Sequence, residues 1–306
     1  MKKNLNNKYK LNGGIFYNND SLKLLKSDKF IKKYSNKVDL VFTSPPFPLI
    51  NQKKYGNKKG EKYIKWFAEY AKPLKKVLNK KGSIVIEIGN TWTPGHPTQS
   101  LIEVKALMKF MEDGGFHLCQ EFVWYNPAKL PGPAEWVTKY RIRVKDSFTK
   151  IWWFAKTPRP YADNKNILKE YSDSMKKLLK DKKYNSGMRA TGHNISEKSF
   201  FTKNKGAIPP NVFENFDNFL RISNTNSRTK YREYCLKKNL TAHPARMPPE
   251  LAEFFIRFLT KKNSLVLDPF AGSNTTGYVA SKLKRKWISI EEDLNYIKGS
   301  KGWFIK

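Results

Sequence analysis

The sequence is poor in cysteine and acidic residues and has no long apolar run. Its 306 residues include two isolated cysteines, Cys119 and Cys235, which excludes a disulfide framework and a paired-cysteine metal site. The four histidines show no metal-ligand spacing either. No apolar run approaches the roughly 20 residues of a membrane span, and the amino terminus lacks the apolar core of a signal peptide. We therefore expect a soluble cytoplasmic protein without a metal.

Basic residues greatly outnumber acidic ones. Lys and Arg total 59 and Asp and Glu 26, which gives a formal charge of +33 at pH 7. Such an excess is typical of proteins that neutralise phosphates, so it favours a nucleic-acid partner. A general enrichment in Lys and Asn, as in proteins from A·T-rich genomes, is the alternative source of part of this charge.

Apolar periodicity predicts alternating strands and helices. We expect strands at 14–18, 38–42, 83–88, 117–125, 148–154, 264–267 and 287–291, and helices at 21–30, 63–78, 100–111, 250–260 and 275–283. The alternation predicts an α/β protein with a parallel sheet and right-handed crossovers. Residues 158–240 are charged, rich in Asn and Ser and punctuated by turn signals, so we expect a small region inserted into this sheet.

A glycine turn follows the strand that ends at Asp268. Gly272 permits close backbone approach to a ligand, and the helix expected from about Thr275 offers free N–H groups. The next strand ends at Glu291, about twenty residues on, where a carboxylate suits the hydroxyls of a ribose. The spacing also fits a phosphate-binding P-loop. Tyr278 and Val279, however, replace the Lys and Ser or Thr of that loop, which argues against a nucleoside triphosphatase.

A second turn, Ser44-Pro45-Pro46-Phe47, follows the apolar strand Val38 to Phe42. Such a turn suits an amine ligand. The exocyclic amine of a nucleobase is a poor nucleophile, because its lone pair is delocalised into the ring, and hydrogen-bond acceptors aimed at the amine hydrogens pull that lone pair out of conjugation. The Ser44 hydroxyl and the Pro45 carbonyl are suited to accept the amine hydrogens, since two prolines fix the backbone and remove donors. Phe47 offers a face for stacking a flipped base. The alternative is an ordinary proline turn followed by a core phenylalanine.

Together the two motifs resemble those of the DNA amino-methyltransferases. The order, with the Ser-Pro-Pro-Phe turn before the glycine turn, is similar to the β group of that family. The resemblance implies a Rossmann-like, mostly parallel seven-stranded sheet with one antiparallel strand, and S-adenosyl-L-methionine (AdoMet) as cofactor. It covers most of the chain from Gly14 to Tyr296. The family usually has Gly where this chain has Asn274.

The resemblance also implies site residues and a division of the chain. The cofactor residues it implies are Asp20, Thr43, His243, Pro244, Asp268, Pro269, Phe270, Ala271, Gly272, Ser273, Asn274, Thr275 and Glu291. Residues 1–157 would form the catalytic half, 158–240 the target-recognition region and 241–306 the AdoMet-binding half. Candidate DNA contacts, from position and charge, are Lys53, Lys54, Arg141, Arg143, Arg228 and Arg232. For each of them a solvated basic surface is the alternative.

Ser before the two prolines is associated in the family mainly with methylation of cytosine N4. We therefore expect a sequence-specific duplex-DNA methyltransferase of a restriction-modification system, with a cognate endonuclease as a further partner. An adenine-N6 enzyme and a non-catalytic DNA-binding protein on the same scaffold are the alternatives. Methylation at cytosine carbon five is disfavoured, because neither cysteine lies beside a proline. Both cysteines are better explained as small buried residues.

Overall fold

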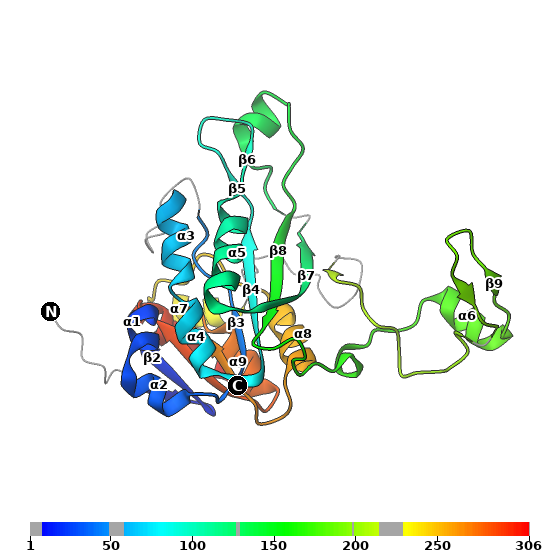
Figure 1. Cartoon of the computed structure of the whole chain (residues 1–306). Helices are drawn as coiled ribbons and strands as arrows, with labels where there is room; N and C mark the ends of the chain where they lie inside the picture. Colours follow the sequence, from blue (N-terminus) through cyan, green and yellow to red (C-terminus); the bar gives the residue numbers. More distant parts are fainter. Residues whose placement is uncertain (1–7, 49–57, 127–128, 198, 214–228, 306) are drawn as a thin grey trace. The chain divides into compact units, whose positions relative to one another are not determined.

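The computed structural model describes residues 8–48, 58–126, 129–197, 199–213 and 229–305. They belong to two compact units (Figure 1). The larger unit comprises Met1–Ala162 and Asn211–Lys306, and the smaller unit is Asp163–Pro210. The chain therefore leaves the larger unit once and returns to it.

One sheet runs through the larger unit, with the order β1-β2-β13-β12-β3-β4-β8-β7-β11 among the described residues. Its strands are β1 (Lys8–Leu11), β2 (Gly14–Asn18), β3 (Val38–Thr43), β4 (Leu78–Gly89), β7 (His117–Tyr125), β8 (Phe148–Ala155), β11 (Val212–Phe213), β12 (Leu265–Asp268) and β13 (Lys286–Glu291). Neighbours are parallel except that β1 is antiparallel to β2, and β8 to both β4 and β7. The strands from β2 to β7 form the expected seven-stranded sheet with one antiparallel strand, and β1 and β11 extend its edges.

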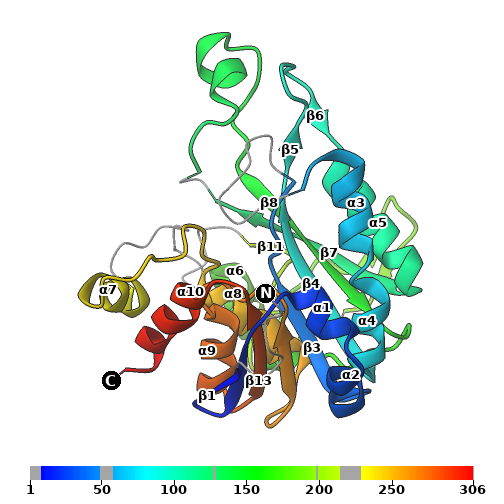
Figure 2. The same ribbon diagram turned by 90° about the vertical axis from the view of Figure 1, so that its left-hand side faces the viewer.

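Helices cover both faces of this sheet (Figure 2). One face carries α1 (Ser21–Lys26), α2 (Asp28–Tyr34), α3 (Gly60–Ala68), α4 (Ala71–Val77) and α5 (Ile102–Gly114), and the other carries α8 (Pro249–Leu259) and α9 (Thr275–Lys282). Near the carboxyl terminus α7 (Lys230–Lys237) packs against α10 (Leu294–Gly299) and η3 (Ser300–Phe304). No helix within the described ranges is both long and apolar enough to cross a membrane.

Two predicted helices are each split in the structure. The helix expected at 21–30 ends at Lys26, because the Ser27 side chain accepts a hydrogen bond from Phe30 N and so caps α2. The helix expected at 63–78 breaks after Ala68. Pro73 has no N–H to bond the carbonyl four residues earlier, so it is tolerated only because α4 begins at Ala71 and places it in the first turn. Hydrophobic periodicity alone does not reveal either break.

The cysteine prediction is correct for one residue and wrong for the other. Cys235 is 1% exposed and packs against Tyr231 and Trp303. Cys119 lies in β7 and is only half-buried. Its neighbours Leu118 and Gln120 are exposed, and among the described residues β11 covers the outer side of β7 only at Val123 and Trp124.

The smaller unit contains α6 (Asp173–Asp181) and a hairpin of β9 (Gly187–Met188) and β10 (Asn194–Ile195). An antiparallel bridge between Lys169 and Ala207 joins its two ends. It covers only the middle of the region 158–240, since β11 and α7 belong to the larger unit. The recognition role of that region stays a prediction.

Candidate active site

The two sequence motifs meet at the carboxyl edge of the sheet, because β3 and β12 are neighbouring parallel strands. Thr43 ends β3 and Asp268 ends β12. The Thr43 hydroxyl donates a hydrogen bond of 2.7 Å to Asp268 Oδ1, across 225 residues of sequence. Ligands of open α/β sheets bind outside such strand ends. The Ser-Pro-Pro-Phe turn and the glycine turn therefore start side by side.

Asp268 fixes the start of the glycine turn. Its Oδ2 accepts from the Thr276 hydroxyl at 2.7 Å, and its Oδ1 also accepts from Phe270 N at 3.1 Å. Burial raises the pKa of Asp268, and the hydrogen bonds from Thr276, Thr43 and Phe270 oppose that shift. The carboxylate thus joins β3, the turn and α9, which makes Asp268 a positioning residue.

The glycine turn uses left-handed backbone at two positions, Gly272 with φ +49° and Asn274 with φ +65°. Asn is the non-glycine residue that adopts this region most readily, which explains how it replaces the family's usual Gly. The Asn274 side chain points inward and its Oδ1 accepts from Ser289 Oγ at 2.6 Å. A Cβ on Gly272 would lie 3.0 Å from Nε2 of His243. Burial lowers the pKa of His243 to about 4, so its ring is neutral at pH 7.

Glu291 at the end of β13 closes the glycine turn. Its Oε2 accepts from Gly272 N, and its Oε1 accepts from Glu292 N and Asp293 N, each at 2.9 Å. Burial raises the pKa of Glu291 and these backbone bonds oppose the shift. A carboxylate offers about four acceptor positions. Three backbone donors thus leave capacity for a ligand hydroxyl.

Ser44 pairs with a buried carboxylate that sequence reasoning missed. Its hydroxyl donates to Glu87 Oε2 at 2.5 Å, and Glu87 is 4% exposed. Burial raises the pKa of Glu87, while the hydrogen bond from Ser44 opposes the shift. Because Glu87 takes the hydroxyl hydrogen, the Ser44 oxygen presents lone pairs to a ligand. The available signal was one acidic residue within the apolar run Ser83 to Ile88.

Aromatic rings form the walls around these groups. A Cβ on Gly89 would lie 2.7 Å from Cε2 of Phe47, so the ring lies directly on the β4 backbone and only glycine permits it. Phe270 packs against Trp66 and Tyr70, with ring centroids 5.8 and 5.0 Å away. Sequence reasoning placed Phe270 at the site and missed the other two rings. Trp66 lies in the last turn of α3, and Tyr70 is the residue before α4.

One cavity of about 1330 Å³ joins the two turns. The sequence-predicted residues that line it are Asp20, Ser44, Pro45, Pro46, Phe47, His243, Asp268, Pro269, Phe270, Ala271, Gly272, Ser273, Thr275 and Glu291. Three predicted cofactor residues do not line it. Thr43 and Asn274 are buried in supporting contacts, and Pro244 is exposed.

The candidate DNA contacts are scattered. Lys53, Lys54 and Arg228 lie outside the described residues. Arg141 is exposed, whereas the Arg143 guanidinium stacks 3.8 Å from the Trp92 ring centre and donates to the Pro97 carbonyl at 2.6 Å. Arg143 therefore joins its loop to the hairpin of β5 (Thr91–Trp92) and β6 (Gln99–Ser100).

Arg232 lies on α7, is partly buried and accompanies Tyr231, whose ring packs under Arg246. A DNA-binding role for Arg141, Arg143 and Arg232 stays a prediction.

The Ser-Pro-Pro-Phe turn beside the glycine turn, at the carboxyl edge of this sheet, is the arrangement predicted for a methyltransferase. Residues 38–302 match the DNA methylase family, and the chain belongs to that family. It is 43% identical over 299 residues to the type II methyltransferase M.PvuII of Proteus hauseri, covering 97% of this chain and 85% of that protein. The predicted family is thereby confirmed.

Two solved structures agree with this assignment. PvuII DNA methyltransferase (cytosine-N4-specific) superposes with a TM-score of 0.73 at 37% identity, covering 96% of this chain and 87% of that one. The complex of M1.HpyAVI with SAM superposes with a TM-score of 0.53 at 22% identity, covering 94% of this chain and 97% of that one, and shows a shared fold. The predicted fold class is confirmed.

Proposed function

We propose that this protein transfers a methyl group from AdoMet to the N4 amine of a cytosine flipped out of duplex DNA. The observation that carries the proposal is the Thr43–Asp268 hydrogen bond, because it fixes the amine-accepting turn beside the cofactor turn. The 43% identity to M.PvuII supports the same conclusion, since the solved PvuII enzyme is named as cytosine-N4-specific.

The residues of the glycine turn fit AdoMet. Glu291 has acceptor capacity left for a ribose hydroxyl, and Gly272 keeps the turn free of a side chain. Phe270, Trp66 and Tyr70 provide an apolar wall for the adenine ring, with Asp20 at the same cavity. AdoMet supplies a methyl group already activated on a sulfonium. The protein's task is therefore to hold and align the acceptor amine.

The other turn performs that task. Glu87 accepts the Ser44 hydroxyl hydrogen, so the Ser44 oxygen is available to accept one amine hydrogen. The carbonyl of the next residue, Pro45, accepts the other amine hydrogen. Both contacts would draw the nitrogen lone pair out of conjugation, so that it can attack a sulfonium methyl group as the carbon–sulfur bond breaks. The methylated amine would then lose a proton, which the Ser44 hydroxyl can pass to the Glu87 carboxylate. Phe47 stacks on the flipped base. Such stacking contributes roughly 1–3 kcal/mol per base, which offsets part of the few kcal/mol that extrusion of the base costs. Alignment of this kind accounts for much of the rate gain in two-reactant enzymes.

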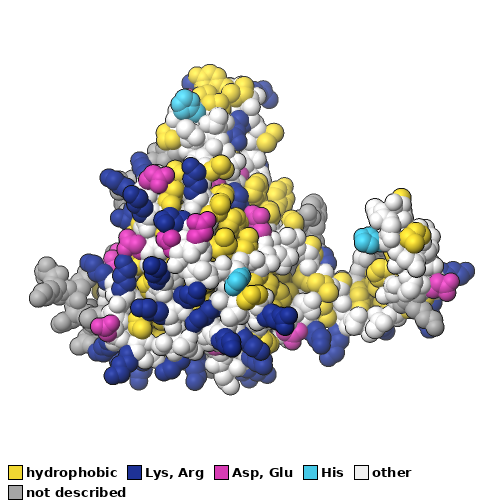
Figure 3. Space-filling model, in the orientation of Figure 1, with side chains coloured by type: hydrophobic (Ala, Val, Ile, Leu, Met, Phe, Trp, Pro, Cys, Tyr) yellow, Lys and Arg dark blue, Asp and Glu magenta, His cyan; other side chains and the backbone are white. Residues whose placement is uncertain are grey.

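Charge and composition support duplex DNA as the partner. The chain carries a formal charge of +33, and Figure 3 shows Lys and Arg side chains over much of the visible surface. Residues 158–240 are proposed to read the target sequence. The similarity to type II methyltransferases supports a cognate restriction endonuclease as a partner. It also supports a cytoplasmic location, because the DNA that the protein is proposed to methylate lies there.

The test is incubation with AdoMet carrying a trideuterated methyl group and mixed-sequence duplex DNA, followed by nucleoside mass spectrometry. Labelled N4-methylcytosine is the expected product, and Ser44→Ala is the matched control that keeps the fold and loses the product. Labelled N6-methyladenine would replace the proposal with the adenine enzyme. AdoMet binding without any labelled nucleoside would leave a non-catalytic DNA-binding protein.

A further inference from the structure

The cavity extends past Ser44 on the side away from the cofactor turn. The strand order β12-β3-β4-β8 places the cofactor turn, Ser44 and Asn90 in succession along one edge of the sheet. Because β8 is antiparallel, its beginning lies at this same edge, and Asp146 lies two residues before it. Asn90, Lys129 and Asp146 line the cavity there. A base whose amine lies at Ser44 would extend toward these three residues.

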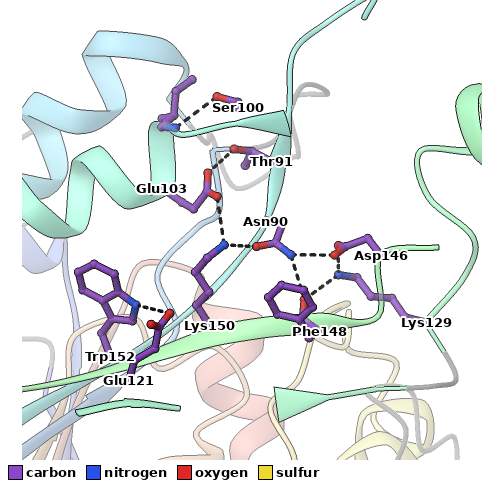
Figure 4. Close-up of polar contacts among 11 residues, drawn as sticks. Asn90, Thr91, Ser100, Glu103, Glu121, Lys129, Asp146, Phe148, Lys150 and Trp152 are labelled. Atoms are coloured by element: carbon purple, nitrogen blue, oxygen red, sulfur yellow. Dashed lines mark hydrogen bonds and ion pairs between the residues drawn. The ribbon is translucent and has the colours of Figure 1, made fainter. Parts of the chain in front are cut away.

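Lys129 is held at this end of the cavity by a nearly buried carboxylate (Figure 4). Its ammonium donates to Asp146 Oδ2 at 2.6 Å and to the Phe148 carbonyl at 3.3 Å. Asp146 Oδ1 accepts from Asn90 Nδ2 at 2.7 Å. The Asp146 side chain is 9% exposed and that of Lys129 is 33% exposed. An ammonium has three N–H groups, so these two contacts orient it and leave one donor for a ligand.

The same network continues away from the cavity (Figure 4). Lys150 donates to Asn90 Oδ1 and to Glu103 Oε1, and Glu103 also accepts from the Thr91 hydroxyl at 2.5 Å. Asn90 is therefore fixed in orientation by a donor on one side and an acceptor on the other. Fixed partners of this kind hold the Lys129 head in one place, which is the preorganisation that a base-reading group needs.

The edges of cytosine and adenine differ at one position that such a donor reads. Both bases present an amine and a ring nitrogen. Beyond the nitrogen, cytosine has a carbonyl oxygen and adenine has a C–H group. Ser44 and Pro45 act on the amine, which both bases share, so they cannot discriminate. A lysine has donors and no acceptor. It therefore favours the carbonyl and leaves its own N–H unpaired against a C–H.

We propose that Lys129, positioned by Asp146, donates a hydrogen bond to the carbonyl oxygen of the flipped cytosine and thereby selects cytosine over adenine. The inference rests on the proposed function. The pairing with Asp146 has a second consequence. It offsets part of the ammonium charge, so Lys129 would repel less strongly an amine that gains positive charge on methylation.

The test uses duplexes of the site that the wild-type protein methylates, with the target nucleotide as either cytosine or a 2-aminopyridine C-nucleoside. The analogue keeps the amine and ring nitrogen and replaces the carbonyl with C–H. The kcat/KM of the wild type should be about 10- to 100-fold higher for cytosine than for the analogue, as expected for a hydrogen bond from a charged donor. In Lys129→Met the value for cytosine should fall by that factor while the analogue is unchanged. Lys139→Met, which removes an exposed lysine at the end of the short π-helix η1 (Glu135–Lys139), should keep the wild-type ratio.

Equal losses on both substrates in Lys129→Met would show a merely structural role and overturn the inference. Wild-type kcat/KM on both substrates would overturn it as well. Lys129→Leu, which also lacks a donor, gives the same comparison should the methionine variant fail to fold. A wild-type protein that forms no N4-methylcytosine refutes the proposed function instead. The two failures are thus distinct.

Discussion

Replacing Thr43 with Val removes the link between the two turns with almost no change in shape. Val has a methyl group where Thr has its hydroxyl, so the shape of the side chain at this buried position, 2% exposed, is preserved while its polar group is lost. Asp268 keeps its hydrogen bonds from Thr276 and Phe270 N and loses the one from β3. The substitution therefore isolates one hydrogen bond between two distant segments.

The magnitude follows from the burial of both partners. A hydrogen bond to a charged group contributes about 1.5–3 kcal/mol net. Asp268 is 3% exposed, so water does not replace the lost donor, and two remaining donors limit the penalty. We expect Thr43→Val to lower the free energy of unfolding by about 2 kcal/mol. It should also lower kcat, because the Ser44 turn is no longer fixed against the cofactor turn.

Urea unfolding gives the free energy, and single-turnover methylation gives the rate. Thr276→Val is the matched control, since it removes a hydrogen bond of the same length to the other oxygen of Asp268 and leaves the link to β3 intact. Both variants should lose similar stability, while Thr43→Val should lose more activity at saturating AdoMet. Wild-type stability in Thr43→Val, or an equal rate in the two variants, would refute the reasoning.

Two further substitutions test the groups around this link. Burial raises the pKa of Glu87, so turnover should fall as pH drops through that raised value and Glu87 gains a proton. Glu87→Gln should lower kcat and abolish this acidic limb, and its stability relative to the wild type should increase as pH rises, because folding favours the protonated acid. A limb retained in single-turnover pH profiles would contradict the assignment. Gly272→Ala should lower the free energy of unfolding by about 1–2 kcal/mol in urea, since left-handed backbone costs a non-glycine residue that much and its Cβ would crowd His243. An unchanged free energy of unfolding would show that the turn tolerates a side chain.

Local signals were sufficient for the seven strands from β2 to β7 of the main sheet and for both turns. Apolar periodicity located the central strands to within a few residues, and the glycine turn is a local motif with its own backbone requirement at Gly272. The helix breaks at Ser27 and after Ala68 were missed, because capping and proline placement outweigh periodicity there.

Contacts that depend on strand register lay beyond the sequence. Glu87 meets Ser44 because β3 and β4 pair with Thr43 opposite Ile86, which brings the next residues of each strand together. Lys129 and Asp146 meet because the loop between β7 and β8 returns to the sheet edge. Neither pair has a sequence spacing that predicts it.

The central claim is that the turn after β3 and the turn after β12 form one site for a base and a cofactor. The most direct measurement is a crystal structure with the AdoMet analogue sinefungin and duplex DNA containing the methylated site. The target cytosine should be flipped, with its amine within hydrogen-bonding distance of Ser44 Oγ and the Pro45 carbonyl, and a ribose hydroxyl of the analogue should contact Glu291. A cofactor bound at the Gly272 turn with the target base lying outside the Ser44 turn would contradict the account.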